Sequence, residues 1–224
     1  MIKDNLEKIF SEISSGNNLG EPITLMGATK FVAVEKINEA IELSLSHIGE
    51  NKAQEFRDKF DFYAPSYKHF IGKLQANKLK YLVAKADCID SVDSVDIAEK
   101  ISSLAKAKGV VQNIMLEVNI GGEENKGGFS ENEAISAYKS IKSLDGVKVI
   151  GIMSMLPIES EEEVASHTER LRAIYDEIKR GDESVKYLSV GISEDYKVTI
   201  KHGANMIRLG TAIFGARDYG ETKR

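Results

Sequence analysis

A lysine stands at the end of the first strand-like segment of the chain, where it could bond covalently to an aldehyde. Residues 23–26 (ITLM) form a short apolar run typical of a buried strand, Gly27 ends that run, and Lys30 follows. Parallel α/β proteins place functional groups at the carboxyl ends of their strands. A desolvated lysine loses its proton and forms a Schiff base with an aldehyde, which arginine cannot do. A surface lysine at a strand end is the alternative interpretation.

Two later segments have the composition of a phosphate-binding site. Residues 188–193 (LSVGIS) and 208–212 (RLGTA) each run from a strand through a glycine to a hydroxyl residue. In barrel proteins, phosphate often binds between the loops after the seventh and eighth strands, on free backbone N–H groups. The candidate binding residues in these segments are Ser189, Gly191, Ser193, Arg208, Gly210 and Thr211. In the alternative interpretation, Ser193 caps a helix and the glycines are turn residues.

Strand-like and helix-like segments alternate along the whole chain. Helical spacing of apolar residues predicts an amphipathic helix near the start, over residues 2–13. Strands are then predicted over residues 23–26, 47–51, 67–72, 88–92, 113–120, 147–153, 185–190 and 206–209. Helical segments separate these strands, among them one over residues 75–84. Such alternation is typical of a parallel sheet with right-handed crossovers.

Eight strand–helix units in about 200 residues predict a (β/α)₈ TIM barrel, an α/β fold with one additional N-terminal helix. We expect a single domain over residues 1–224, with the leading helix in 1–15 and the barrel in 22–215. The alternative is an open, doubly wound sheet. Against it, no G-x-G-x-x-G turn follows the first strand and no Walker A motif occurs.

The composition limits the molecules that the protein could bind and the compartment in which we expect it. The net charge of −5 argues against general nucleic-acid binding, which needs a basic face. The single cysteine, Cys88, excludes an internal disulfide and suits a reducing cytosol, so we expect a cytoplasmic protein. No apolar run is long enough to span a membrane, and residues 1–10 do not form a signal peptide. Because a closed barrel has no open sheet edge, we expect a monomer.

No metal site is predicted, because no His, Cys, Asp and Glu residues have metal-ligand spacing. His69 lies on an internal strand beside Phe70 and Ile71. In that position a hydrogen-bonded core histidine is more common than an acid or base catalyst. We therefore assign no catalytic residue from the sequence.

Together, these motifs resemble the pyridoxal phosphate homeostasis proteins. The resemblance rests on Lys30 after the first strand, on residues 69–78 (HFIGKLQANK), 91–94 (SVDS) and 188–195 (LSVGISED), and on residues 208–215 (RLGTAIFG). It runs in the right order from about residue 23 to residue 215. The segments around His69 and Arg208 are the most specific to the family.

The resemblance implies a barrel like the N-terminal domain of alanine racemase that binds pyridoxal 5′-phosphate (PLP). In the family, Lys30 corresponds to the lysine that holds PLP as a Schiff base, and the loops with Ser193 and Thr211 correspond to the phosphate cup. The implied cofactor-binding residues are Lys30, Asn51, Met153, Ser189, Gly191, Ser193, Arg208, Gly210 and Thr211. Arg208 would face the pyridine nitrogen and keep it unprotonated, which weakens PLP as an electron sink. Lys126 matches a lysine implicated in PLP transfer.

The chain departs from the family pattern just after its first lysine. The family has a Lys-Thr-Lys-Pro-like run there, whereas Phe31, Val32 and Ala33 follow Lys30 in this chain. The second lysine of the family run is therefore replaced by Val32, and a PLP-holding role for that position does not carry over.

We expect a protein of intracellular PLP (vitamin B6) homeostasis that holds the cofactor without catalytic turnover and delivers it to PLP-dependent apo-enzymes. A PLP-dependent amino-acid racemase is an alternative, but a racemase needs acid–base groups on both faces of the substrate. In alanine racemase one of them comes from a second, β-rich domain, and we expect no such domain after Gly215. A third hypothesis is a Schiff-base aldolase that uses Lys30 on a phosphorylated substrate.

Overall fold

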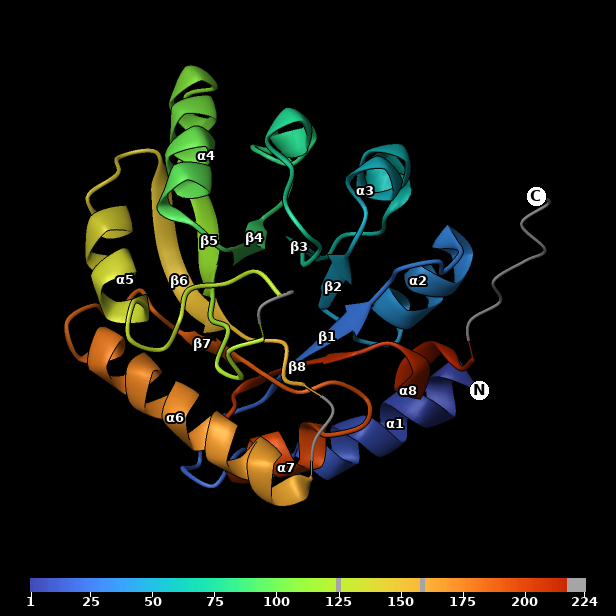
Figure 1. Ribbon diagram of the computed structural model, residues 1–224. Helices are drawn as coiled ribbons and strands as arrows, with labels where there is room; N and C mark the ends of the chain where they lie inside the picture. Colours follow the sequence, from blue (N-terminus) through green and yellow to red (C-terminus); the bar gives the residue numbers. More distant parts are fainter. Residues whose placement is uncertain (124–125, 158–159, 217–224) are drawn as a thin grey trace.

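The strands of this protein close into a parallel barrel in the computed structural model, which describes residues 1–123, 126–157 and 160–216. Each strand pairs with its neighbours in the sequence, and β1 pairs with β8 to close the barrel (Figure 1). The strands are β1 Thr24–Ala28, β2 His47–Glu50, β3 Tyr67–Phe70, β4 Cys88–Val92, β5 Gln112–Glu117, β6 Val147–Met153, β7 Tyr187–Ser189 and β8 Met206–Leu209. The predicted barrel class is confirmed, and the open sheet is excluded.

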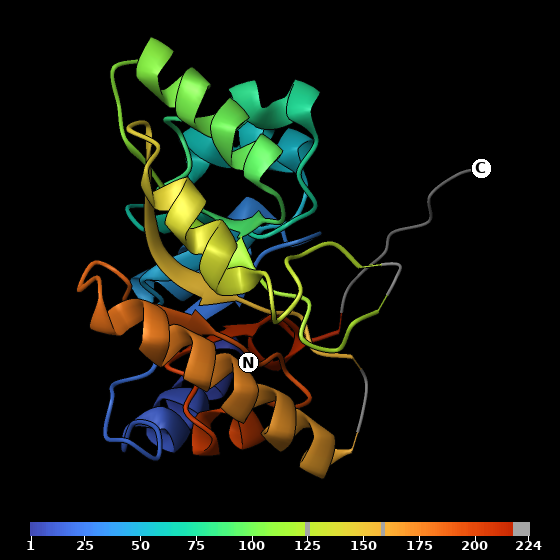
Figure 2. The same ribbon diagram turned by 60° about the vertical axis from the view of Figure 1, so that its left-hand side comes forward.

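Helices cover the outside of the barrel in the predicted alternation with the strands (Figure 1). They are α1 Ile2–Ile13, α2 Val34–Glu42, α3 Ala53–Lys59, η1 Phe60–Phe62, η2 Ala76–Tyr81, α4 Val95–Ala107, α5 Ala134–Lys142, α6 Glu161–Arg180, α7 Tyr196–Lys201 and α8 Thr211–Phe214, where η marks a 3₁₀-helix. The predicted leading helix is α1, whose apolar face is buried in a cluster with residues of α2 and α8. Figure 2 shows the long helix α6 crossing the outside of the barrel, and it contacts both α5 and α7. Among the described residues, no helix is long and apolar enough to cross a membrane.

The segment between β3 and β4 differs from the prediction. The helix predicted over residues 75–84 is present as the shorter 3₁₀-helix η2. The apolar residues Leu79 and Leu82 are both buried, and a 3₁₀-helix places residues three apart on one face. The Leu82 N–H donates to the Leu79 carbonyl at 2.9 Å, and the positive φ of Ala84, 67°, is incompatible with a helix that continues to residue 84.

The core has an outer layer between strands and helices and a separate layer inside the barrel. The interior layer consists mostly of methionine and contains Met26, Cys88, Met115, Ile150, Met153 and Met206. Strands buried on both faces explain why their sequences are nearly continuous apolar runs. Methionine is flexible and fills irregular space, which suits the tapered interior of a small barrel.

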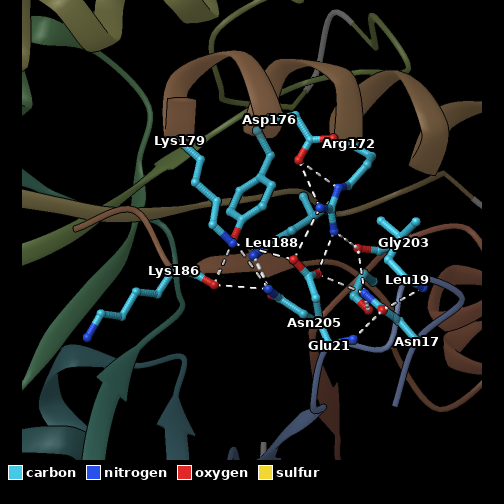
Figure 3. A network of polar contacts seen from close by, with 12 residues as sticks. Asn17, Leu19, Glu21, Arg172, Asp176, Lys179, Lys186, Leu188, Gly203 and Asn205 are labelled. Carbon is cyan, nitrogen blue, oxygen red and sulfur yellow. Dashed lines mark hydrogen bonds and ion pairs between the residues drawn. The ribbon is translucent and has the colours of Figure 1, made fainter. Parts of the chain in front are cut away.

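The amino end of the barrel is held together by a network of paired charges, shown in Figure 3. The Arg172 guanidinium of α6 donates to the Glu21 carboxylate, with Nη1–Oε2 at 2.5 Å, and Asn17 donates to the same oxygen at 2.9 Å. Asp176 and Lys179 extend the network along α6. Burial by itself would raise the pKa of Glu21, but the hydrogen bonds from Arg172 and Asn17 outweigh it and hold that pKa at about 2. The network therefore ties the segment before β1 to helix α6.

Candidate functional site

A cavity of about 550 Å³ opens at the carboxyl ends of the strands, and this volume is typical of small-molecule sites. Five of the predicted binding residues line it: Asn51, Ser193, Arg208, Gly210 and Thr211. They come from the turn after β2, the loop between β7 and α7, strand β8 and the start of α8. Barrel closure therefore brings together segments that are far apart in the sequence.

The loop after β7 requires glycine at its second position, residue 191. Gly191 has a φ of +110°, and a Cβ atom there would lie only 2.4 Å from Thr199 Oγ1 and 3.0 Å from Tyr196 Cα. Its carbonyl accepts the backbone N–H of Arg208 at 2.9 Å. Gly191 therefore joins the loop to β8 behind the cavity rather than lining the cavity itself.

The two loops meet and present unpaired donors to the cavity. The Ala212 N–H donates to Ser193 Oγ at 3.3 Å, which joins the β7–α7 loop to the start of α8. Within the described part of the chain, the backbone N–H groups of Ser193, Glu194 and Thr211 have no hydrogen-bond acceptor. Clustered free N–H groups of this kind suit a phosphate or another anion.

Arg208 is a buried cation at the floor of the cavity, with 3% of its surface exposed. Nη1 donates to the Ser189 carbonyl at 2.7 Å and to Ser189 Oγ at 2.8 Å, and Nη2 donates to the Ser154 carbonyl at 2.8 Å. Burial lowers the pKa of Arg208, and the negative charge of Asp90 opposes that effect. The hydrogen bonds hold the guanidinium plane in one orientation.

Lys30 lies in the turn after β1 and is half-buried. Its Nζ lies 5.2 Å from the centroid of the Phe31 ring, and Lys30 is not one of the described residues that line the cavity. The turn is held on both sides, because Thr29 Oγ1 donates to Glu50 at 3.2 Å and the Phe31 N–H donates to Glu55 at 3.3 Å. Phe31 has a positive φ of 62°, which is uncommon for a bulky residue and marks strain in this turn.

Met153 and Ser189 also lie outside the cavity lining formed by the described residues. Met153 is 1% exposed and packs in the interior methionine layer. Ser189 is fully buried and contacts Arg208 through its carbonyl and hydroxyl oxygens. Ser189 therefore contacts Arg208, and Met153 packs against the other residues of the interior layer.

Several lining residues were not predicted from the sequence. Residues 155–157, which follow β6, and Glu161 of α6 form one wall of the cavity. Asp195 lies opposite, accepts the Ile192 N–H at 2.6 Å, and has a pKa raised by burial. The sequence feature that could have indicated this wall of the cavity is the apolar run that continues past β6 into Met155 and Leu156.

Lys126 and Val32, the two further positions compared with the family pattern, lie near the rim of the cavity or behind it. Lys126 Nζ donates to the carbonyl of the cavity residue Leu156 at 3.5 Å and forms an ion pair with Glu123. Val32, which replaces the second lysine of the family run, packs against the apolar cluster that includes α1 and α2. Its apolar side chain therefore contributes to packing.

Inside the barrel, below the cavity, polar side chains of β2, β3 and β4 contact one another. His69 is fully buried and hydrogen-bonded to Asp90 and to His47, as expected for a core histidine. Possible ligand atoms of His69, Cys88 and Asp90 all lie within 4.8 Å of one another. Spacing along the sequence could not reveal this cluster, because the contact joins two strands. Burial raises the pKa of the Cys88 thiol.

Comparison with known proteins identifies close relatives of this barrel. Residues 23–218 match the family model described as the N-terminal domain of alanine racemase. A curated protein of Aquifex aeolicus named pyridoxal phosphate homeostasis protein is 36% identical over 222 residues, which cover 97% of this chain and 96% of the relative. These matches extend over nearly the whole chain.

Solved structures show the same architecture. PipY of Synechococcus elongatus, whose structure is described as having PLP bound, superposes with a TM-score of 0.83 at 26% identity and covers 96% of this chain and 100% of PipY. An alanine racemase of Clostridium difficile superposes with a TM-score of 0.81 at 14% identity, over 98% of this chain and 60% of the racemase. The second match shows a shared fold.

Proposed function

The chain belongs to the family of the pyridoxal phosphate homeostasis proteins, and we propose that it binds PLP at the carboxyl end of its barrel and acts in intracellular PLP homeostasis. The observation that carries the proposal is the set of unpaired N–H donors of Ser193, Glu194 and Thr211 beside the buried Arg208. Such a cup fits a phosphate next to a flat ring. The relative PipY, which shares the barrel, has a solved structure with PLP bound.

In this proposal the phosphate lies between two loops. The loop after β7 supplies the backbone N–H groups of Ser193 and Glu194, the start of α8 supplies that of Thr211, and Ser193 and Thr211 add hydroxyl donors. Gly191 keeps its loop close to β8, because a Cβ atom would contact Thr199. The hydrogen bond from the Ala212 N–H to Ser193 holds the two halves of the cup at a constant separation.

Arg208 faces the cofactor ring in this proposal, and Asn51 lines the same cavity. Bound PLP would supply an aldehyde and an electron-withdrawing ring. A guanidinium beside the ring nitrogen disfavours a second positive charge there, which weakens electron withdrawal. Arg208 would therefore reduce electron withdrawal by the ring, while leaving the aldehyde free to bond to a lysine.

We assign Lys30 as the residue that bonds to PLP as a Schiff base. Lys30 follows Ala28, which lines the cavity, by two residues. Within the described residues, the only contact of the Lys30 ammonium group is with the Phe31 ring. The side chain can therefore leave this position for the cavity without breaking a hydrogen bond or an ion pair. The bonds of Thr29 and Phe31 to Glu50 and Glu55 hold the backbone of the turn in place.

The test is the visible absorption spectrum of the protein with added PLP, before and after borohydride reduction, followed by peptide mapping. We expect a yellow band that borohydride removes, with the pyridoxyl group on Lys30. Lys30→Ala should lose the band. Lys52→Ala is the matched control, because Lys52 Nζ also lies over the Phe31 ring, at 4.0 Å, and the control should keep the band.

Two results would contradict the proposal. An unchanged band in Lys30→Ala would exclude the lysine assignment while leaving PLP binding intact. A wild-type protein that takes up no PLP would exclude the function and favour the Schiff-base aldolase. Absence of turnover is tested by an amino-acid racemization assay on the loaded protein, and transfer by incubation with a PLP-dependent apo-enzyme. Gel filtration tests the monomeric state.

A further inference from the structure

The hydrogen bonds of Arg208 do not neutralise its buried positive charge. It is almost fully buried, yet its hydrogen-bond acceptors among the described residues are neutral: oxygens of Ser189 and Ser154 and the sulfur of Met155. Within the described residues it forms no ion pair. A buried charge is costly unless an opposite charge compensates it. The barrel must therefore supply that charge from another position.

Three carboxylates act on Arg208 through space: Asp90 most strongly, then Asp195 and Glu117. Asp195 and Glu117 are both partly exposed, so solvent screens their charges. Asp90 differs, because it is fully buried and points into the barrel interior. Its position follows from strand alternation, since Asp90 lies two residues after the interior residue Cys88.

The same alternation places Arg208 inside the barrel, because it lies two residues after the interior residue Met206. The Asp90 and Arg208 side chains therefore enter one enclosed space from β4 and β8, which are not adjacent in the barrel. In such an enclosure, charges act on each other over longer distances than in water.

A chain of hydrogen bonds holds Asp90 in place. His69 Nδ1 lies 2.8 Å from Asp90 Oδ1 and 3.0 Å from Oδ2, and a carboxylate only accepts, so Nδ1 carries the proton. The other nitrogen of His69, Nε2, lies 3.0 Å from His47 Nδ1. Burial and the neighbouring His69 lower the pKa of His47 to about 4, although Asp90 opposes this effect. His47 is therefore uncharged at neutral pH and does not neutralise Asp90.

We propose that Asp90, oriented by His69 and His47, is the counter-charge of Arg208 inside the barrel and sets the electrostatic potential that a bound cofactor ring meets. The second half of this inference rests on the proposed function; the first half does not. Asp90 and His69 are positioning residues, because they act through Arg208. A divalent cation held by His69, Cys88 and Asp90 would instead add positive charge beside Arg208, which argues against a metal at this cluster.

The first experiment uses the protein without PLP. A double-mutant cycle of Asp90→Asn and Arg208→Met measures the interaction of the two side chains through chemical unfolding. We expect Asp90→Asn to lower the folding equilibrium constant at least tenfold in the wild-type background. The same substitution should have a much smaller effect in the Arg208→Met background, where no buried cation needs a partner.

The second experiment uses the PLP-loaded protein and follows its visible band against pH. Asp90→Asn removes a negative charge near the site, which disfavours the protonated Schiff base, so the midpoint should fall by about one pH unit. Asp90→Glu should restore it in part. His47→Gln keeps both charges and removes only an orienting hydrogen bond, so it should shift the midpoint less than Asp90→Asn does.

The outcomes separate the two proposals. If the wild-type protein forms no band, the proposed function fails, and the cycle still tests the Asp90–Arg208 pair. Additive effects in the cycle, or an unchanged midpoint in Asp90→Asn, would overturn the inference. If Asp90→Asn does not fold, the double variant decides: recovery of folded protein supports the counter-charge, and continued failure overturns it.

Discussion

The two ends of the barrel differ in whether their polar groups have hydrogen-bond partners within the protein. At the amino end, Glu21, Arg172 and Asn17 are bonded to one another, as Figure 3 shows. At the carboxyl end, the N–H groups of Ser193 and Thr211 have no acceptor within the described residues. Both ends contain a buried or half-buried arginine, but of these two only Arg172 forms a direct ion pair with another described residue.

This difference separates stability from binding. A polar group bonded within the protein contributes to folding and is not available to a ligand. An unpaired group at a cavity weakens the folded state slightly and can be paired by the ligand. Barrel proteins commonly divide these roles between their two ends. Substitutions at the amino end should therefore change stability without changing PLP binding, whereas those at the carboxyl end should change PLP binding.

The largest effect is expected from Gly191→Ala at the carboxyl end. A Cβ atom there meets Thr199 Oγ1 at 2.4 Å and requires a positive φ, so we expect a loss of about 4 kcal/mol in unfolding free energy. PLP affinity should also fall by about tenfold or more, because the cup loop must move. Urea unfolding and PLP titration measure the two effects.

Gly20→Ala is the matched control for Gly191→Ala at the other end. Gly20 also has a positive φ, of 75°, but no atom lies within 4 Å of the added Cβ. It should cost only about 1 kcal/mol from the backbone conformation and leave PLP affinity unchanged. Equal costs for the two substitutions would contradict the close contact at Gly191.

The next largest effect is expected from Glu21→Gln at the amino end. Hydrogen bonds from Arg172 hold the pKa of Glu21 at about 2, below its usual 4.5, so its charge stabilises the fold. Removing that charge should lower the unfolding free energy by about 3 kcal/mol at pH 7. PLP affinity should not change, and a parallel loss of PLP binding would contradict the division between the two ends.

The pH dependence of the same variant gives a sharper test. Since the folded-state pKa of Glu21 is depressed, its stabilisation is complete above about pH 4.5 and disappears as pH falls toward about 2. The stability difference between wild type and Glu21→Gln should therefore shrink as pH falls through this window. Urea unfolding at several pH values measures it, and a constant difference would exclude this account.

The smallest effect is expected from Ser193→Ala. Losing the hydroxyl removes an acceptor for the Ala212 N–H and a donor to the proposed phosphate, which should weaken PLP binding by about 0.5–1.5 kcal/mol. Ser184→Ala is the counterpart at the amino end, since Ser184 Oγ bonds to Asp182 at 2.7 Å. It should lower stability and leave PLP affinity unchanged.

Much of the fold could be predicted, because burial leaves a local pattern. The predicted strands over residues 147–153 and 206–209 match β6 and β8, since each is a buried apolar run bounded by turn residues. The strand predicted over residues 113–120 extends beyond the end of β5 at Glu117. Val118 and Ile120 are buried in the loop after β5 rather than in that strand. Apolar composition reports burial and does not distinguish a strand from a buried loop.

The candidate site was predicted only in part. Strand-end position identified Asn51, Ser193 and Arg208, which do line the cavity. It could not show that Ser189 contacts Arg208 instead, because a side chain's direction depends on its neighbours across the barrel. The PLP-binding roles of all these residues stay predictions that the experiments above test.

The periodicity of buried residues was enough to specify the alternation of strands and helices, the barrel class and the loops that carry polar groups. These features are local, because each is set by a few successive residues and their preference for water or core. Barrel closure alone decided that Asp90 and Arg208 share one interior, that His69 meets Asp90, and that Lys52 lies over the Phe31 ring. Such contacts depend on strand register and on side-chain packing between segments far apart in the chain, and no local pattern encodes them.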